Sequence, residues 1–114
     1  KYKTMKKFVW TILLALFSYT ANAQIHVVHF NADWNSANDV KWFKQLEDVD
    51  KFTTICIAAK PDKQKKYEIV VVPTIIIFKD GEEVKRFQAD ISFAMKAKLE
   101  DVQEVINEQL MSDF

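Results

Sequence analysis

The clearest indication of the fold of this chain is VVHFNADWNSAN, residues 27–38. Its first half completes an apolar, mostly β-branched run over residues 25–31, which is typical of a strand buried on both faces. Its second half is polar, and Asn35 and Ser36 are residue types that favour helix N-termini. Apolar residues then recur at helical spacing at positions 40, 43 and 46. The pattern predicts a strand followed by a helix that begins near Ser36, with Asn35 as its N-cap.

The chain downstream keeps alternating strands and helices. Residues 52–58 (FTTICIA) are predicted as a second strand and residues 61–67 as a short polar helix, an order that implies a parallel crossover. A third strand is predicted at 71–78 and a fourth at 83–88, and the Asp-Gly pair between them is a hairpin signal. Apolar residues on one face over residues 91–111 predict a terminal helix. The predicted fold is therefore α/β, in the order βαβαββα, with a four-stranded mixed sheet flanked by helices.

The first 23 residues have the features of a secretion signal. Lys6 and Lys7 precede an apolar run that ends near Tyr19, and Ala21-Asn22-Ala23 is a small-residue cleavage signal. The run has roughly 12 residues, whereas a membrane-spanning helix needs about 20. We therefore expect cleavage after residue 23, a single domain over residues 24–114, and an exported product, periplasmic or secreted, with no membrane contact after cleavage.

Loss of that segment would change the charge balance. All 16 acidic residues lie after residue 23, whereas four of the 16 basic residues precede it, so residues 24–114 carry a net charge of about −4. A nucleic-acid partner is not expected, since no basic face offsets these acids. The basic cluster KPDKQKK at residues 60–66 is interpreted as a solvated turn and short helix.

Side chains able to carry redox or metal chemistry are few. Cys56 is the single cysteine, so the chain cannot cycle an internal disulfide. Its place in an apolar strand favours a core side chain, and a reactive thiol or an intermolecular disulfide is the alternative. His26 and His29 lie three residues apart in a strand, which places them on opposite faces and argues against a shared metal ion. We expect neither a metal nor a cofactor.

Four short motifs carry a family resemblance. Trp34-Asn35-Ser36-Ala37-Asn38 follows the first strand, Lys66-Tyr67 precedes Val72-Pro73-Thr74, and Phe78-Lys79-Asp80-Gly81 forms the hairpin. In this order and spacing the chain resembles the thioredoxin family over roughly residues 25–110, and the family's W-C-G-P-C would occupy residues 34–38. The thioredoxin fold is therefore expected.

The departures from that family bear on activity. The resemblance places Asn35 and Asn38 at the nucleophilic and resolving cysteines, His29 at a buried acid, and Thr54 at the lysine that partners the acid. An asparagine amide has no thiolate and no redox couple, so disulfide exchange lacks its reactants. Ser36 could serve as a nucleophile at a helix N-terminus, but helix capping is the favoured interpretation. We therefore expect a redox-inactive module with no catalytic residue.

The resemblance also implies a binding groove. In the family, the residue before a cis-proline offers its backbone to an extended peptide, which implies a cis Val72–Pro73 bond here. The groove would consist of Trp34, Asn35, Ser36, Asn38, Val72 and Pro73. The favoured function is therefore binding of a polypeptide partner or an unfolded protein.

Two other functions stay open on the sequence. One is a thiol–disulfide oxidoreductase or glutathione-type transferase that uses a divergent one-cysteine or serine site. The other is a self-associating structural module. The family's first strand has no counterpart between residue 24 and the strand at 25–31, which would leave the strand from Phe52 to Ala58 at the sheet edge. Because an unpaired apolar edge is a template for association, either a weak homodimer through that strand or a covering of the strand by the N-terminal residues is expected.

Overall fold

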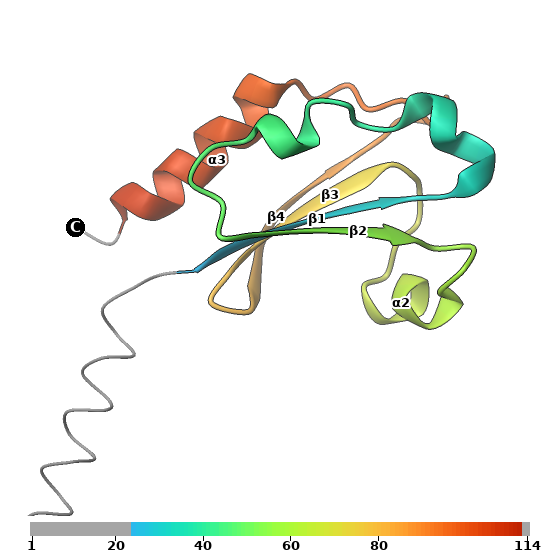
Figure 1. Ribbon diagram of the computed structural model, residues 1–114, viewed down its shortest axis with the longest axis horizontal. Helices are drawn as coiled ribbons and strands as arrows, with labels where there is room; N and C mark the ends of the chain where they lie inside the picture. The colour runs from blue at the N-terminus through green and yellow to red at the C-terminus, as the bar shows by residue number, and fades with distance from the viewer. Residues whose placement is uncertain (1–23, 113–114) are drawn as a thin grey trace, which may run out of the picture.

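A four-stranded mixed sheet forms the centre of the chain (Figure 1). The computed structural model describes residues 24–112, so the predicted signal segment at residues 1–23 lies outside the described residues. The strand order is β2-β1-β3-β4, in which β1 pairs parallel with β2, and β3 is antiparallel to both of its neighbours. The strands are β1 (Ile25–Asn31), β2 (Lys51–Cys56), β3 (Thr74–Lys79) and β4 (Glu82–Gln88). The predicted α/β sheet, its crossover and its hairpin are confirmed.

Both faces of the sheet are covered (Figure 1). The helix α3 (Leu99–Met111) and two short 3-10 helices, η1 (Asp33–Asn38) and η2 (Phe43–Gln45), lie over one face, and α2 (Pro61–Lys66) lies over the other. Alternate residues of β1 therefore enter two apolar clusters. Ile25 and Val27 pack with Val102 and Ile106 of α3 on the first face, and Phe30 packs with the segment after α2 on the second. This explains why β1 is apolar almost throughout.

The hairpin between β3 and β4 has the predicted turn. Asp80 and Gly81 both have positive φ, 52° and 86°, which is the backbone that a two-residue hairpin turn of the primed type requires. The Asp-Gly pair therefore sets the β3/β4 register by its local conformational preference.

The segment after β1 is not the single helix that the sequence predicts. It forms η1 and η2 instead, Ala32 precedes η1, and Asn35 lies inside η1 with φ −115° and ψ 19°. The prediction of Asn35 as an N-cap is therefore wrong. Asp, Asn and Ser crowd this segment, and such side chains compete with helical backbone bonds by making bonds of their own.

The terminal helix is also shorter than predicted, because residues 91–98 lie outside it. Asp90 Oδ1 accepts hydrogen bonds from the backbone and hydroxyl of Ser92, and Phe93 has φ 60°, which stops a helix there. Lys98 N–H donates to Asp101 Oδ2 at 2.8 Å, which caps α3 at its observed start.

Candidate functional site

The candidate site lies where β1 ends and η1 begins, and Asn35 is at its centre. Its side chain is buried, and the amide nitrogen donates to Asn31 Oδ1 at 3.1 Å, to the Phe93 carbonyl at 3.1 Å and to the Val72 carbonyl at 3.4 Å. Its Oδ1 accepts from Asn38 Nδ2 at 2.9 Å. The amide therefore joins η1 to two segments that lie 37 and 58 residues away along the chain.

Asn31 extends this network to the end of η1. Its Nδ2 donates to the Asn35 carbonyl at 3.2 Å and to the Asp39 carboxylate. A buried side chain thus satisfies polar groups of a segment that lacks regular helical bonds. The positions that the resemblance assigns to two cysteines form part of a hydrogen-bonded amide network.

The loop before β3 lies against Asn35. The Val72–Pro73 peptide bond is cis, and the Val72 side chain is buried. The Pro73 carbonyl accepts from Ala89 N–H at 3.0 Å, and Thr74 Oγ1 donates to the Val71 carbonyl at 2.6 Å. Within residues 24–112, the Val72 N–H has no hydrogen-bond acceptor, whereas its carbonyl is held by Asn35.

Two aromatic rings mark the exposed side of the site. Trp34 is 64% exposed, and its ring meets Phe93 edge-on with 5.2 Å between ring centroids. Phe93 is itself 40% exposed and belongs to the turn before α3. We call these two residues the Trp34–Phe93 patch. Phe93 is not among the predicted groove residues, because the apolar spacing over residues 91–111 placed it in a helix. Asp90 and Ser92, two residues apart, are a turn signal that could have located it.

The predicted groove residues divide into two groups. Asn35, Asn38 and Val72 come together through hydrogen bonds, and Trp34 joins them through Phe93. Ser36 is exposed, and no hydrogen bond of its hydroxyl exists within residues 24–112. In the described part of the chain, the Ser36 hydroxyl therefore neither caps a helix nor bonds to a side chain that could activate it.

His29 occupies a different environment from the two asparagines. It is only 4% exposed, it packs against Phe43 with 5.3 Å between ring centroids, and its buried Nε2 has no hydrogen-bond partner among the described residues. Burial lowers the pKa of His29, and the negative charge of Asp39 offsets part of that effect. Burial therefore favours the neutral imidazole at this position, and Thr54, its pair on β2, is exposed.

Cys56 is less buried than predicted. It is half-buried at the end of β2 and lines a shallow depression with Asn31, Ser36 and Asp39. The prediction of a core side chain is wrong, since Cys56 belongs to neither apolar cluster, and β2 pairs with only one neighbour within residues 24–112. His26 and His29 do lie on opposite faces, since His26 contacts Phe78 and Thr53 on the other side of the sheet.

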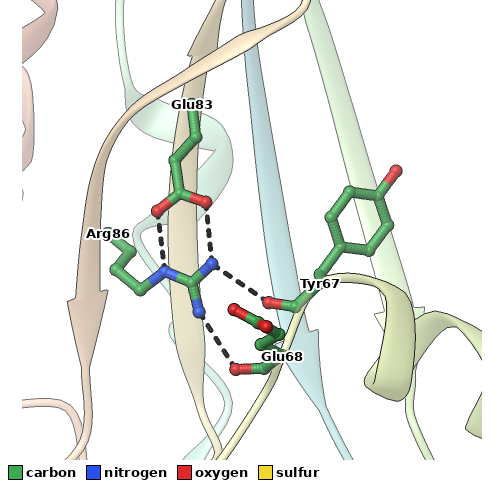
Figure 2. A network of polar contacts seen from close by, with 4 residues as sticks. All are labelled: Tyr67, Glu68, Glu83 and Arg86. Carbon is green, nitrogen blue, oxygen red and sulfur yellow. Dashed lines mark hydrogen bonds and ion pairs between the residues drawn. The ribbon is translucent and has the colours of Figure 1, made fainter.

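Arg86 fixes the segment that leads to the cis-proline loop (Figure 2). Its Nη2 and Nη1 donate to the carbonyls of Tyr67 at 3.0 Å and Glu68 at 3.2 Å. Glu83 orients the guanidinium by accepting from Nε at 2.8 Å and from Nη2 at 2.7 Å. The hydrogen bond from Arg86 lowers the pKa of Glu83. Strand β4 thereby holds the C-terminal end of α2 and the residues just before Val72.

Metal and membrane features are not found in the described residues. No group of three or more His, Cys, Asp or Glu side chains within residues 24–112 could hold a metal ion. In the same part of the chain, no helix combines the length and the apolar character needed to cross a bilayer.

Comparison with known proteins gives one sequence relative and many structural ones. No family model matches the chain. Glutaredoxin 3 of Danio rerio is 39% identical over 67 residues, which cover 53% of this chain and only 20% of that protein. The thioredoxin pre-protein of Schistosoma mansoni superposes with a TM-score of 0.59 and 27% identity, over 84% of this chain and 88% of that one. A mutant thioredoxin of Halobacterium salinarum also gives a TM-score of 0.59, at 19% identity, over 75% and 74% of the two chains.

The sheet order, the turn after β1 and the superposition on two thioredoxins define a thioredoxin-like fold. The chain has the thioredoxin fold, and asparagines stand at both positions where the resemblance places cysteines. The predicted resemblance and fold class are confirmed.

Proposed function

We propose that this thioredoxin-like chain is an exported module that binds extended polypeptide beside the cis-proline loop and performs no thiol–disulfide exchange. The observation that carries the proposal is the Trp34–Phe93 patch, two exposed aromatic rings next to a backbone segment that is fixed on several sides. Exposed aromatic pairs beside an ordered backbone suit recognition, because they add apolar contact area at little cost in conformational entropy.

The Val72 backbone supports strand-like pairing. Its N–H has no acceptor within residues 24–112, and Val72 is only 2% exposed, so a peptide carbonyl that satisfies this N–H has to displace the atoms that cover it. The Val72 carbonyl, in contrast, already accepts a hydrogen bond from Asn35 Nδ2 at 3.4 Å. A long bond of this kind is weak, and a carbonyl has a second lone pair, so a peptide N–H can share the Val72 oxygen or displace the amide. We expect recognition of main-chain groups with modest affinity and little sequence preference.

The absence of redox exchange follows from the side chains at the two family positions. Asn35 and Asn38 are hydrogen-bonded to each other and provide no sulfur. Cys56 lies at the end of β2, and the residue opposite it on β1 is Asn31 rather than a second thiol. Exchange between two thiols of one chain therefore has no basis in this sequence.

The experiment uses a reduced, carboxymethylated protein, which stays unfolded and has no free thiol. Titration calorimetry with the purified chain should give saturable binding, and Trp34→Ala should weaken it about tenfold or more, a loss of about 1.4 kcal/mol. Cys56→Ser should leave the affinity unchanged, because the proposal involves no sulfur.

Met111→Ala is the matched control, since Met111 is an exposed apolar residue and the last residue of α3. It should bind as the unmodified chain does. Equal losses in Trp34→Ala and Met111→Ala would indicate nonspecific apolar contact and contradict the proposed site. Binding that requires Cys56, or catalysed disulfide reduction that disappears in Cys56→Ser, would favour the one-cysteine enzyme instead.

A further inference from the structure

The outer edge of β2 is an interaction surface that polypeptide binding at the Trp34–Phe93 patch does not use. We propose that β2 pairs antiparallel with β2 of a second copy of this chain, with the twofold axis at Thr54. The two four-stranded sheets would then continue as one sheet across the dimer.

The free groups on this edge follow from the ladder with β1. Asn31 pairs with Cys56, and the Ile57 N–H donates to the Asn31 carbonyl at 2.9 Å. In a parallel ladder, alternate residues of a strand direct both N–H and C=O toward the same neighbour. The N–H and C=O groups of Phe52, Thr54 and Cys56 therefore point away from β1. Within residues 24–112, no other strand pairs with these groups. The Cys56 carbonyl alone is occupied, by the N–H groups of residues 59 and 60.

The two edges of the sheet differ in charge. The sequence of β4 is EEVKRFQ, in which charged side chains are the majority, and such residues discourage pairing with another chain. The sequence of β2 is KFTTIC, with a single charge at its first residue and neither proline nor bulge. The β2 edge thus lacks the features that usually protect an edge strand.

A twofold axis at Thr54 makes this strand complementary to itself. Thr54 lies opposite Thr54 of the second copy, and the two exchange both backbone hydrogen bonds. The Cys56 N–H of each copy meets the free Phe52 carbonyl of the other. Phe52 and Cys56, both half-buried, become cross-strand neighbours, while Lys51 faces an apolar residue, Ile57, rather than another charge. Apolar and threonine pairs are favourable in such positions, and no like charges are opposed.

The test compares the same added charge on the two edges. In sedimentation equilibrium, the unmodified chain should show a concentration-dependent mass that rises toward twice the monomer. Thr54→Lys places two lysines opposite each other at the axis, so its dimer dissociation constant should rise about tenfold or more. Gln88→Lys adds the same charge to an exposed residue of β4 and should leave the dissociation constant unchanged.

Hydrogen exchange gives an independent measurement. The amides of Thr54 and Cys56 should become protected as protein concentration rises, because only the second copy covers them. A mass of one monomer at every concentration would overturn the proposal, as would a dimer that tolerates Thr54→Lys. Protection of these amides that does not depend on concentration would show that another segment of the same chain covers β2, and would overturn it too.

Discussion

Asn35 shows how one residue can connect three parts of a fold. Its amide is buried among the side chain of Asn31 and the carbonyls of Val72 and Phe93, so every polar atom of the side chain has a partner. The resemblance places a redox residue at this position. The geometry instead gives it a structural role, because its bonds hold η1 against the cis-proline loop and the turn before α3.

Removal of that amide should destabilise the chain. Asn35→Ala removes the buried donor that bonds to the Asn31 side-chain oxygen and to the carbonyls of Val72 and Phe93, which costs about 1–3 kcal/mol of the free energy of unfolding. Urea denaturation measures this loss. Ser36→Ala, at an exposed neighbour whose hydroxyl makes no hydrogen bond within residues 24–112, should change stability by no more than about 0.5 kcal/mol. Similar losses in the two variants would show that the Asn35 network contributes no stability of its own.

At the scale of elements, the strands were more predictable than the helices. The apolar runs at residues 25–31 and 74–78 and the Asp-Gly turn are local signals, and the structure has β1, β3 and the hairpin at or near the predicted residues. The segment after β1 and residues 91–98 were wrongly assigned to helices. Apolar spacing alone indicated a helix there, whereas side-chain bonds of Asn35 and Asp90 to distant or local backbone determine the conformation.

The candidate site was predictable only where it lies in short motifs. Trp34, Asn35 and Val72 were identified by resemblance, whereas the hydrogen bond from Asn35 to Val72 and the contact of Phe93 with Trp34 depend on tertiary structure. No periodicity in the sequence encodes that contact. The bonds of Arg86 to the end of α2 were likewise not predicted, because they link residues 18 and 19 apart through backbone carbonyls.

These bonds make Arg86 a positioning residue for the cis-proline loop. Arg86→Lys keeps the charge but loses the planar set of donors, so the end of α2 should loosen. Faster amide hydrogen exchange at Tyr67, Glu68 and Ile69 is expected, with a stability loss of no more than about 1 kcal/mol. Polypeptide affinity should fall severalfold as Val72 becomes less fixed.

Glu83→Gln provides the matched control for Arg86. It removes the carboxylate and leaves the guanidinium able to donate to the carbonyls of Tyr67 and Glu68. Its effect on exchange at the end of α2 should be the smaller one. If Glu83→Gln loosens this segment as much as Arg86→Lys does, the ion pair, and not the carbonyl contacts, fixes the loop.

At the scale of the whole molecule, stability depends on two apolar clusters on opposite faces of one sheet. With a single cysteine, no disulfide within the chain constrains the unfolded state. The cluster beneath η1 and α3 is also next to a buried ionisable group, since His29 contacts Phe43 of that cluster. Protonation of this one imidazole therefore affects the packing that the entire fold relies on.

The free energy of unfolding should decrease as the pH falls from about 7.5 to about 5. Burial lowers the pKa of His29 below its ordinary value of 6.5, and the pKa of the less buried His26 is lowered by burial and by the charge of Lys51. Because the unfolded chain then binds more protons than the folded chain, acid favours unfolding. The negative charge of Asp39 raises the pKa of His29 and so offsets part of the effect of burial. Urea denaturation at several pH values measures the slope of the free energy of unfolding against pH. His29→Gln should remove most of this slope, whereas His26→Gln should keep most of it. A slope that is unchanged in His29→Gln, or stability that rises toward pH 5, would contradict a buried neutral imidazole at the centre of the fold.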